Sequence, residues 1–236
     1  FGGDARVIDA LNDLSGKIDT EFADEPDVAA ELHHRFTEAF GAHAGSMKSE
    51  EQRERILFHA RRALELRKRF YGERHELVAK DMVYLYWAGG VEESQLANYL
   101  MAAIEMMRET NPNNLNLPYM LEGYSSRLMM PDTPQTHEAY RQAVTPLSDE
   151  NKYQIAERFL REAMPVFRFH YKEDNYAIFA NECRLSYTLA MQGKWSDFDE
   201  HFAICKQGEE KLKGSDLAVG MRLNVEIVER ALPRTN

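Results

Sequence analysis

The chain has 236 residues, of which 44% are hydrophobic and 29% are charged, a composition typical of a globular protein that is long enough to bury a core. Its formal net charge of −10 disfavours general binding to nucleic acid or to an anionic membrane surface. No apolar run approaches the roughly 20 residues that a bilayer-spanning helix needs. We therefore expect no nucleic-acid partner and no direct membrane contact from this stretch.

Helical patterns fill the first half of the chain. Between residues 5 and 21, apolar side chains recur three and four residues apart, which predicts an amphipathic helix. Pro26 suits the first position of a second helix, and Gly41 is a suitable end for it. A third helix is expected to stop at Gly72, and its basic side chains over 61–69 are expected to lie mostly in solvent. Two further helices are expected over about 75–88 and 92–109.

The second half of the chain contains more breaks. Residues 111–118 have the composition of a loop, and Pro131 and Pro134 mark another break. Pro165 lies inside a long helical pattern and is expected to kink or break it, because its ring displaces a backbone hydrogen bond. The helices expected here cover about 119–130, 135–145, 148–172, 174–192, 195–213 and 215–232. No stretch alternates apolar and polar residues convincingly, so we expect no β-sheet.

A regular spacing is present in the last third of the chain. Steps of 4, 4, 5, 4 and 3 residues separate Leu185, Leu189, Gly193, Phe198, Phe202 and Cys205. This segment resembles the tetratricopeptide repeat, which has bulky residues in a first helix, a small residue in the turn, and small or apolar residues in a second helix. Phe198 and Cys205 stand where alanine is usual, and Phe198 is expected to push the two helices apart.

The upstream segments resemble a longer variant of this repeat, found in kinesin light chains and many bacterial proteins, whose second helix ends in a Gly-x-x-His-Pro-x-Val-Ala turn. Residues 72–79 read Gly-Glu-Arg-His-Glu-Leu-Val-Ala, so Glu76 replaces the proline of that turn. Ala63, Ala103 and Ala143 are 40 residues apart in each step, and each is followed by an apolar residue.

The resemblance implies an all-α fold in which antiparallel helix pairs stack as a right-handed superhelix. A single domain over 1–236 is expected, with N-terminal repeats over 5–110, an irregular middle repeat over 111–147 and C-terminal repeats over 148–236. The segment Ile18–Leu32 is similar to the opening of repeat regions in bacterial signalling proteins. Because the chain begins Phe-Gly-Gly-Asp, without an initiator methionine, we expect it to be a piece of a longer protein. The resemblance implies a bacterial protein, and the sequence leaves open whether this portion is cytoplasmic or periplasmic.

In such a superhelix, the first helix of each pair lines the concave face, and its side chains between the packing positions can meet a ligand. The resemblance places Lys80, Tyr84 and Trp87 at these positions in one repeat. It places Arg184, Tyr187 and Met191 there in the last repeat. Aromatic and cationic side chains suit an extended peptide with a carboxylate or apolar anchors. The alternative is that Tyr84, Trp87 and Tyr187 only pack against the next repeat.

No sequence pattern typical of catalysis or metal binding is present. The chain contains no His-Glu-x-x-His segment, no Cys-x-x-Cys pair, no calcium loop, no glycine-rich phosphate loop and no nucleophile elbow. The adjacent His33 and His34 cannot both face the same side of a helix. Cys183 and Cys205 are expected on adjacent antiparallel helices as two packed thiols, with a disulfide as the alternative if the domain is extracytoplasmic. We expect no cofactor and no metal.

The expected function is that of a non-catalytic scaffold for protein or peptide interaction, as the sensory or regulatory part of a larger bacterial signalling protein. Self-association, which would make the chain a homo-oligomer, is the alternative within binding. An enzyme that uses a pocket between helices is the alternative of another class.

Overall fold

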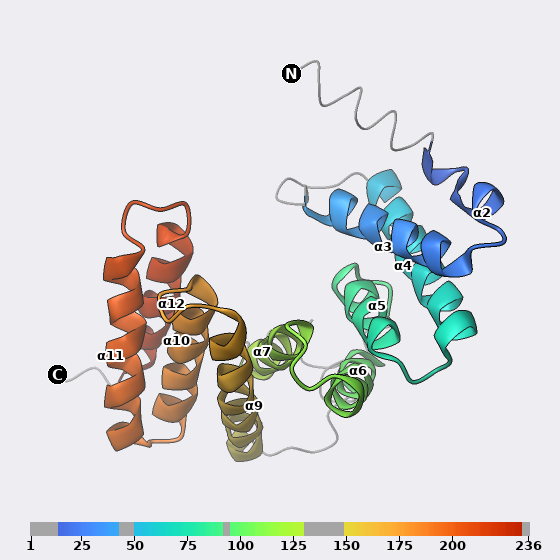
Figure 1. Cartoon of the computed structure of the whole chain (residues 1–236). Helices are drawn as coiled ribbons and strands as arrows, with labels where there is room; N and C mark the ends of the chain where they lie inside the picture. The colour runs from blue at the N-terminus through green and yellow to red at the C-terminus, as the bar shows by residue number, and fades with distance from the viewer. Residues whose placement is uncertain (1–13, 43–49, 92–94, 130–148, 233–236) are drawn as a thin grey trace. The chain divides into compact units, whose positions relative to one another are not determined.

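The computed structural model describes residues 14–42, 50–91, 95–129 and 149–232 (Figure 1). Over these ranges the chain has ten helices and no strand, which confirms the all-helical prediction. The helices are α2 Ile18–Glu21, α3 Pro26–Ala42, α4 Glu50–Tyr71, α5 Glu76–Trp87, α6 Leu96–Thr110, α7 Asn116–Met129, α9 Asp149–His170, α10 Tyr176–Met191, α11 Trp195–Lys211 and α12 Ala218–Ala231. The helix expected over 135–145, with Ala143, lies outside the described residues.

The chain divides into two compact units between Asn111 and Pro112. In the first unit, helices that follow one another pack together: α2 on α3, α3 on α4, α4 on α5 and α5 on α6. Small residues let α3 and α4 approach closely, since Ala29, Ala60 and Ala63 are all buried. Pro26 opens α3 as predicted.

The second unit has its own core. Helix α7 packs on α9, α9 on α10, and α10 on both α11 and α12. The core contains Leu160, Phe179, Leu189, Phe202, Met221, Val225 and Val228. Gly208 lets α11 approach α10, because a Cβ atom at this position would lie 2.5 Å from Cγ of Phe179.

The repeat-like spacing falls on the interface between α10 and α11. The buried members are Leu185, Leu189, Phe198, Phe202 and Cys205. Gly193 forms the turn between the two helices with φ of +70°, a conformation that favours glycine. Phe198 stacks along its own helix on Phe202, with ring centroids 5.1 Å apart. The result is a closely packed helical hairpin.

A disulfide joins Cys183 of α10 to Cys205 of α11, whose Cα atoms are 4.8 Å apart. The expectation of two packed thiols is therefore wrong for this structure. Both residues are buried in the hairpin, and the two helices are close enough at this level for the side chains to meet. The spacing of 22 residues along the sequence was compatible with either state.

Three helices differ from the sequence prediction near a glycine or a proline. The helix expected over 5–21 is interrupted by a turn at residues 16–17, because glycine weakens a helix that has little else to support it. Pro118, expected in a loop, lies in the first turn of α7, where a backbone N–H is not needed. Pro165 does not break α9; it is exposed, so the carbonyl of Arg161 that loses its partner can reach water.

Candidate functional site

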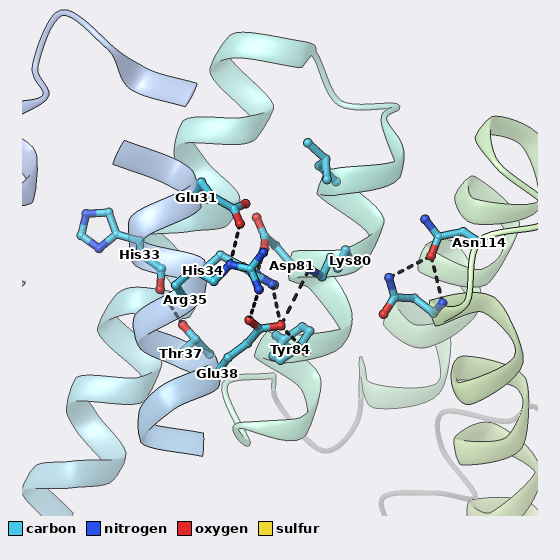
Figure 2. Close-up of polar contacts among 12 residues, drawn as sticks. Glu31, His33, His34, Arg35, Thr37, Glu38, Lys80, Asp81, Tyr84 and Asn114 are labelled. Atoms are coloured by element: carbon cyan, nitrogen blue, oxygen red, sulfur yellow. Dashed lines mark hydrogen bonds and ion pairs between the residues drawn. The ribbon is translucent and has the colours of Figure 1, made fainter. Parts of the chain in front are cut away.

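Two of the predicted ligand-contacting residues, Lys80 and Tyr84 of α5, face Glu38 of α3 (Figure 2). The Tyr84 hydroxyl donates to Glu38 Oε1 at 2.8 Å, and Lys80 Nζ lies 3.8 Å from the same oxygen. Arg35 donates to Glu38 Oε2 at 2.8 Å. Burial raises the pKa of the Tyr84 phenol, and its hydrogen bond to Glu38 adds to that rise. Both side chains are therefore engaged within the unit, while Trp87 ends α5 with a side chain outside the described part of the chain.

A buried chain of charged groups continues from this point across three helices. His34 Nδ1 of α3 and Arg67 Nη1 of α4 each lie 2.7 Å from Asp81 Oδ1 of α5. Arg67 Nη2 also donates to Glu31 Oε2 of α3 at 2.6 Å. His34, Arg67 and Asp81 are each only 1% exposed, so water competes little for these contacts. The chain ties α3, α4 and α5 together through charges of opposite sign.

A second polar chain lies on another face of α3 and ends at Ser15. His33 Nδ1 faces His59 Nδ1 of α4 at 2.7 Å, and His59 Nε2 lies 3.0 Å from Ser15 Oγ. His33 Nε2 lies 3.5 Å from Asp19 Oδ1. Burial alone would raise the pKa of Asp19, but the hydrogen bond from Arg62 and nearby positive charge outweigh it, so the pKa is lowered.

The contact between His33 Nδ1 and His59 Nδ1 requires a proton on one of the two nitrogens and a lone pair on the other. His33 Nε2 is buried and makes no hydrogen bond with any described residue, although Asp19 Oδ1 lies 3.5 Å away. Burial lowers the pKa of both histidines, that of His59 to about 4, so both rings are neutral at neutral pH.

The predicted residues of the last repeat belong to the second unit, where Arg184 is engaged as well. Its Nη1 donates to Glu122 Oε1 at 2.6 Å and its Nε donates to Ser126 Oγ at 3.0 Å, both on α7. Tyr187 is half-buried, and Met191 is exposed at the end of α10. Of these three predicted residues, Met191 is therefore the one that presents a large part of its side chain to solvent.

An open pocket of about 360 Å³ lies between α2, the start of α3 and the end of α4. Its apolar walls are formed by Phe22, Ala23, Pro26, Ala29, Leu66 and Phe70. Two arginines also line it. Arg62 is occupied by Asp19 and Glu65, both at 2.8 Å. Arg69 is exposed and makes no ion pair with any residue in the described ranges. We call this the Arg69 pocket.

A second open pocket, of about 350 Å³, lies between α3, α4 and the start of α5. Its apolar side is formed by Val28, Leu32, Tyr71 and Leu77. Glu31 and Arg67 of the buried charged chain also line it. Asp27 is exposed at this pocket, and within the described part of the chain it has no ion-pair partner. We call this the Asp27 pocket.

No protein-family model and no curated protein sequence matches the chain. Among the residues that the structure describes, no group of three or more His, Cys, Asp or Glu side chains could hold a metal ion. None of the helices in those ranges combines the length and apolar character that crossing a membrane requires. The candidate site is therefore characterised by its own geometry: two pockets beside the first turns of α3, and a buried charged chain behind one of them.

Sequence reasoning missed Arg67, which was grouped with the solvated basic residues of its helix. A signal was present, because Ile56, Ala60 and Ala63 form the buried stripe of α4 and Arg67 continues it four residues on. An arginine in the register of an apolar stripe indicates a buried acidic partner, here Asp81.

Proposed function

We propose that the chain is a non-catalytic scaffold that binds an extended segment of a partner protein. The observation that carries this proposal is the pair of pockets beside the first turns of α3, each with apolar walls. Arg69 supplies an available positive charge at one pocket, and Asp27 supplies an available negative charge at the other. A segment with two apolar anchors, one beside an acidic residue and the other beside a basic residue, would fit both pockets.

The apolar anchors would supply most of the affinity. Burial of one leucine- or phenylalanine-sized side chain contributes about 1.5–3 kcal/mol, and part of that is lost to the entropy of association. Exposed ion pairs contribute only roughly 0–1 kcal/mol each, so Arg69 and Asp27 would set the orientation of the segment more than its affinity. We expect binding on the order of micromolar.

The buried charged chain supports this proposal because it holds the Asp27 pocket in shape. Glu31 and Arg67 both line that pocket and are hydrogen-bonded to each other. The contact of Arg67 with Asp81 fixes this wall of the pocket to α5. A preformed pocket loses less conformational entropy on binding than a mobile one. Lys80 pairs with Glu38, and Arg184 pairs with Glu122. These two cations are therefore better suited to holding neighbouring helices together than to contacting a partner.

The same proposal extends to the fold and its setting. We propose that the hairpins belong to a right-handed superhelix of the tetratricopeptide type, within a larger bacterial signalling protein. Packing of consecutive helices within each unit and the left-handed turn glycines Gly72 and Gly193 support it. A crystal structure of the whole chain tests it, and hairpins that stack without a constant right-handed rotation would contradict it.

The binding proposal is tested with peptides. Random peptides displayed on phage are selected on the whole chain, resynthesised with a fluorescent label, and titrated by anisotropy. We expect Arg69→Ala and Asp27→Ala each to weaken binding about twofold to fivefold, and Leu32→Arg to abolish it. Lys172→Ala and Glu173→Ala, exposed changes in the second unit, are the matched controls. Peptides that bind all five variants as tightly as the original chain, or a selection that yields none, would refute the proposal.

One contact favours a second candidate function. Ser15 Oγ lies 3.0 Å from His59 Nε2, which is the arrangement of a nucleophile and its general base. Binding is the better-supported function because Ser15 lines neither pocket. A fluorophosphonate probe distinguishes the two, since a nucleophilic Ser15 would be labelled in the original chain and not in Ser15→Ala. Absence of labelling would remove this candidate.

A further inference from the structure

Helix α12 has two apolar faces, and only one of them is buried in the unit. Met221, Val225 and Val228 are 0–3% exposed and belong to the core of the second unit. A second stripe, of Val219, Leu223 and Ile227, is spaced by four residues, and these side chains are 60%, 51% and 51% exposed.

The three side chains follow one another at successive turns and form a continuous stripe about 12 Å long. Leu217, just before α12, is also exposed and extends the apolar surface. Isolated exposed apolar residues are common, but a stripe on one helix face indicates a partner.

We propose that α12 binds α12 of a second copy of the chain in an antiparallel pair, with Leu223 at the two-fold axis. Residues equally far before and after Leu223 then face each other across the interface. Val219, four residues before it, meets the partner's Ile227, four residues after it. The stripe is therefore complementary to itself when one copy is reversed, as a two-fold interface requires.

The charges at the two ends of the stripe select a second copy in this orientation. Arg230 lies seven residues after Leu223, two helical turns along α12, and Asp216 lies seven residues before it, in the turn that precedes α12. An antiparallel pair brings Asp216 beside the partner's Arg230 at both ends, whereas a parallel pair would bring Arg230 beside its own counterpart. Asp216 makes no ion pair with the residues that the structure describes, and it is available for this contact. Arg230 pairs with Glu226 of its own helix at 3.5 Å, and the partner's Asp216 would join or replace that exposed contact. Opposed helix dipoles also favour the antiparallel arrangement.

The proposed pair uses one helix of 14 residues from each copy. Such an interface is smaller than the ~1,200–2,000 Å² typical of stable complexes, so we expect a weak, concentration-dependent dimer. It is independent of the peptide-binding proposal, because α12 belongs to the second unit and both pockets belong to the first.

Sedimentation velocity of the whole chain, from low micromolar to millimolar concentration, tests the proposal. We expect a monomer–dimer equilibrium whose Kd rises at least about tenfold in Leu223→Arg. Asp216→Arg and Arg230→Asp should each raise Kd about fivefold by opposing like charges, and the double variant should restore it to within about twofold. Lys172→Asp is the matched control for an exposed charge reversal. Circular dichroism confirms that each variant remains folded.

Three outcomes would overturn the proposal. A monomer at every concentration would exclude a second copy of the chain as the partner of the stripe. A dimer that Leu223→Arg leaves unchanged would place the interface elsewhere. If the Kd of the double charge-reversal variant were as high as that of the single variants, the antiparallel register would be excluded.

Discussion

His33 Nδ1 lies 2.7 Å from His59 Nδ1 inside the first unit, so the two rings share a single proton. A second proton between these nitrogens would place two N–H groups against each other with no acceptor. Both residues are buried, and α2, α3 and α4 surround them. Protonation of either ring should therefore destabilise the junction of these three helices.

The stability of the chain should fall as the pH falls from about 6.5 towards 4. An unfolded histidine has a pKa of about 6.5, whereas burial and the neighbouring His33 lower the pKa of folded His59 to about 4. Because the folded pKa is lowered, the stabilisation is fully present above pH 6.5 and is lost on acidification. His59 alone should account for about 3 kcal/mol. Urea denaturation at a series of pH values measures this dependence.

His59→Leu is the diagnostic variant for that pH dependence, and the exposed His170→Gln is its control. We expect His59→Leu to flatten the curve between pH 6.5 and 4, whatever its stability at neutral pH, and His170→Gln to keep the original slope. Equal slopes in the original chain and in His59→Leu would contradict the shared-proton arrangement.

Arg67→Met should lower the free energy of unfolding by about 3–5 kcal/mol, because it leaves the buried carboxylate of Asp81 without its cation. Arg67→Lys should recover part of the loss, since one ammonium cannot reproduce the two-pronged contact with Asp81 and Glu31. Chemical denaturation gives both values. Arg61→Met, on the exposed face of the same helix, should change stability by less than about 0.5 kcal/mol. Similar losses for Arg61→Met and Arg67→Met would argue against the buried chain.

Removal of the disulfide should destabilise the second unit. The bond closes a span of 22 residues between α10 and α11, and the loop-entropy relation gives about 3 kcal/mol for a loop of that length. Thermal melts of Cys183→Ala/Cys205→Ala against the oxidised chain measure the difference. Alkylation of the native chain without reductant, followed by mass spectrometry, is the check on the bond itself. Two alkylated cysteines in that experiment would mean that the thiols are free.

Gly208→Ala should destabilise the chain by about 1–3 kcal/mol, because the new methyl group would overlap the ring of Phe179. The sign of this change is informative, since glycine to alanine inside an exposed helix usually stabilises by roughly 0.5–1 kcal/mol. Thermal denaturation of Gly208→Ala beside the original chain shows whether the melting temperature rises or falls. Stabilisation would mean that α11 and α10 are less closely packed than the structure shows.

The starts and ends of several helices were predicted correctly, because they depend on residues close to them in the sequence. Pro26 opens a helix, and Gly72 and Gly193 end helices with positive φ, because each residue acts through its own backbone. Of the kink or break predicted at Pro165, the break does not occur, because the effect of proline depends on whether the freed carbonyl faces water, which only the packed structure decides.

The candidate site depends on contacts between distant residues, which a local pattern does not record. Tyr84 was predicted to contact a ligand, and its hydroxyl donates to Glu38, a residue 46 positions away that the sequence pattern did not connect to it. No local sequence pattern marks Asp27 or Arg69 as a pocket residue, because their pockets form only where helices meet. The packing of Cys183 beside Cys205 was predicted from the hairpin, whereas the bond between them was not.

Two consecutive histidines of α3 contact different neighbours, His33 the ring of His59 on α4 and His34 the carboxylate of Asp81 on α5. Each residue turns a helix by about 100°, so rotating α3 by one position would remove both imidazoles from these partners at once. The two contacts together therefore fix the rotation of α3 about its own axis. A single-residue insertion before His33 should be far more disruptive than any substitution at the surface of α3, because no sliding of the helix can restore one contact without losing the other.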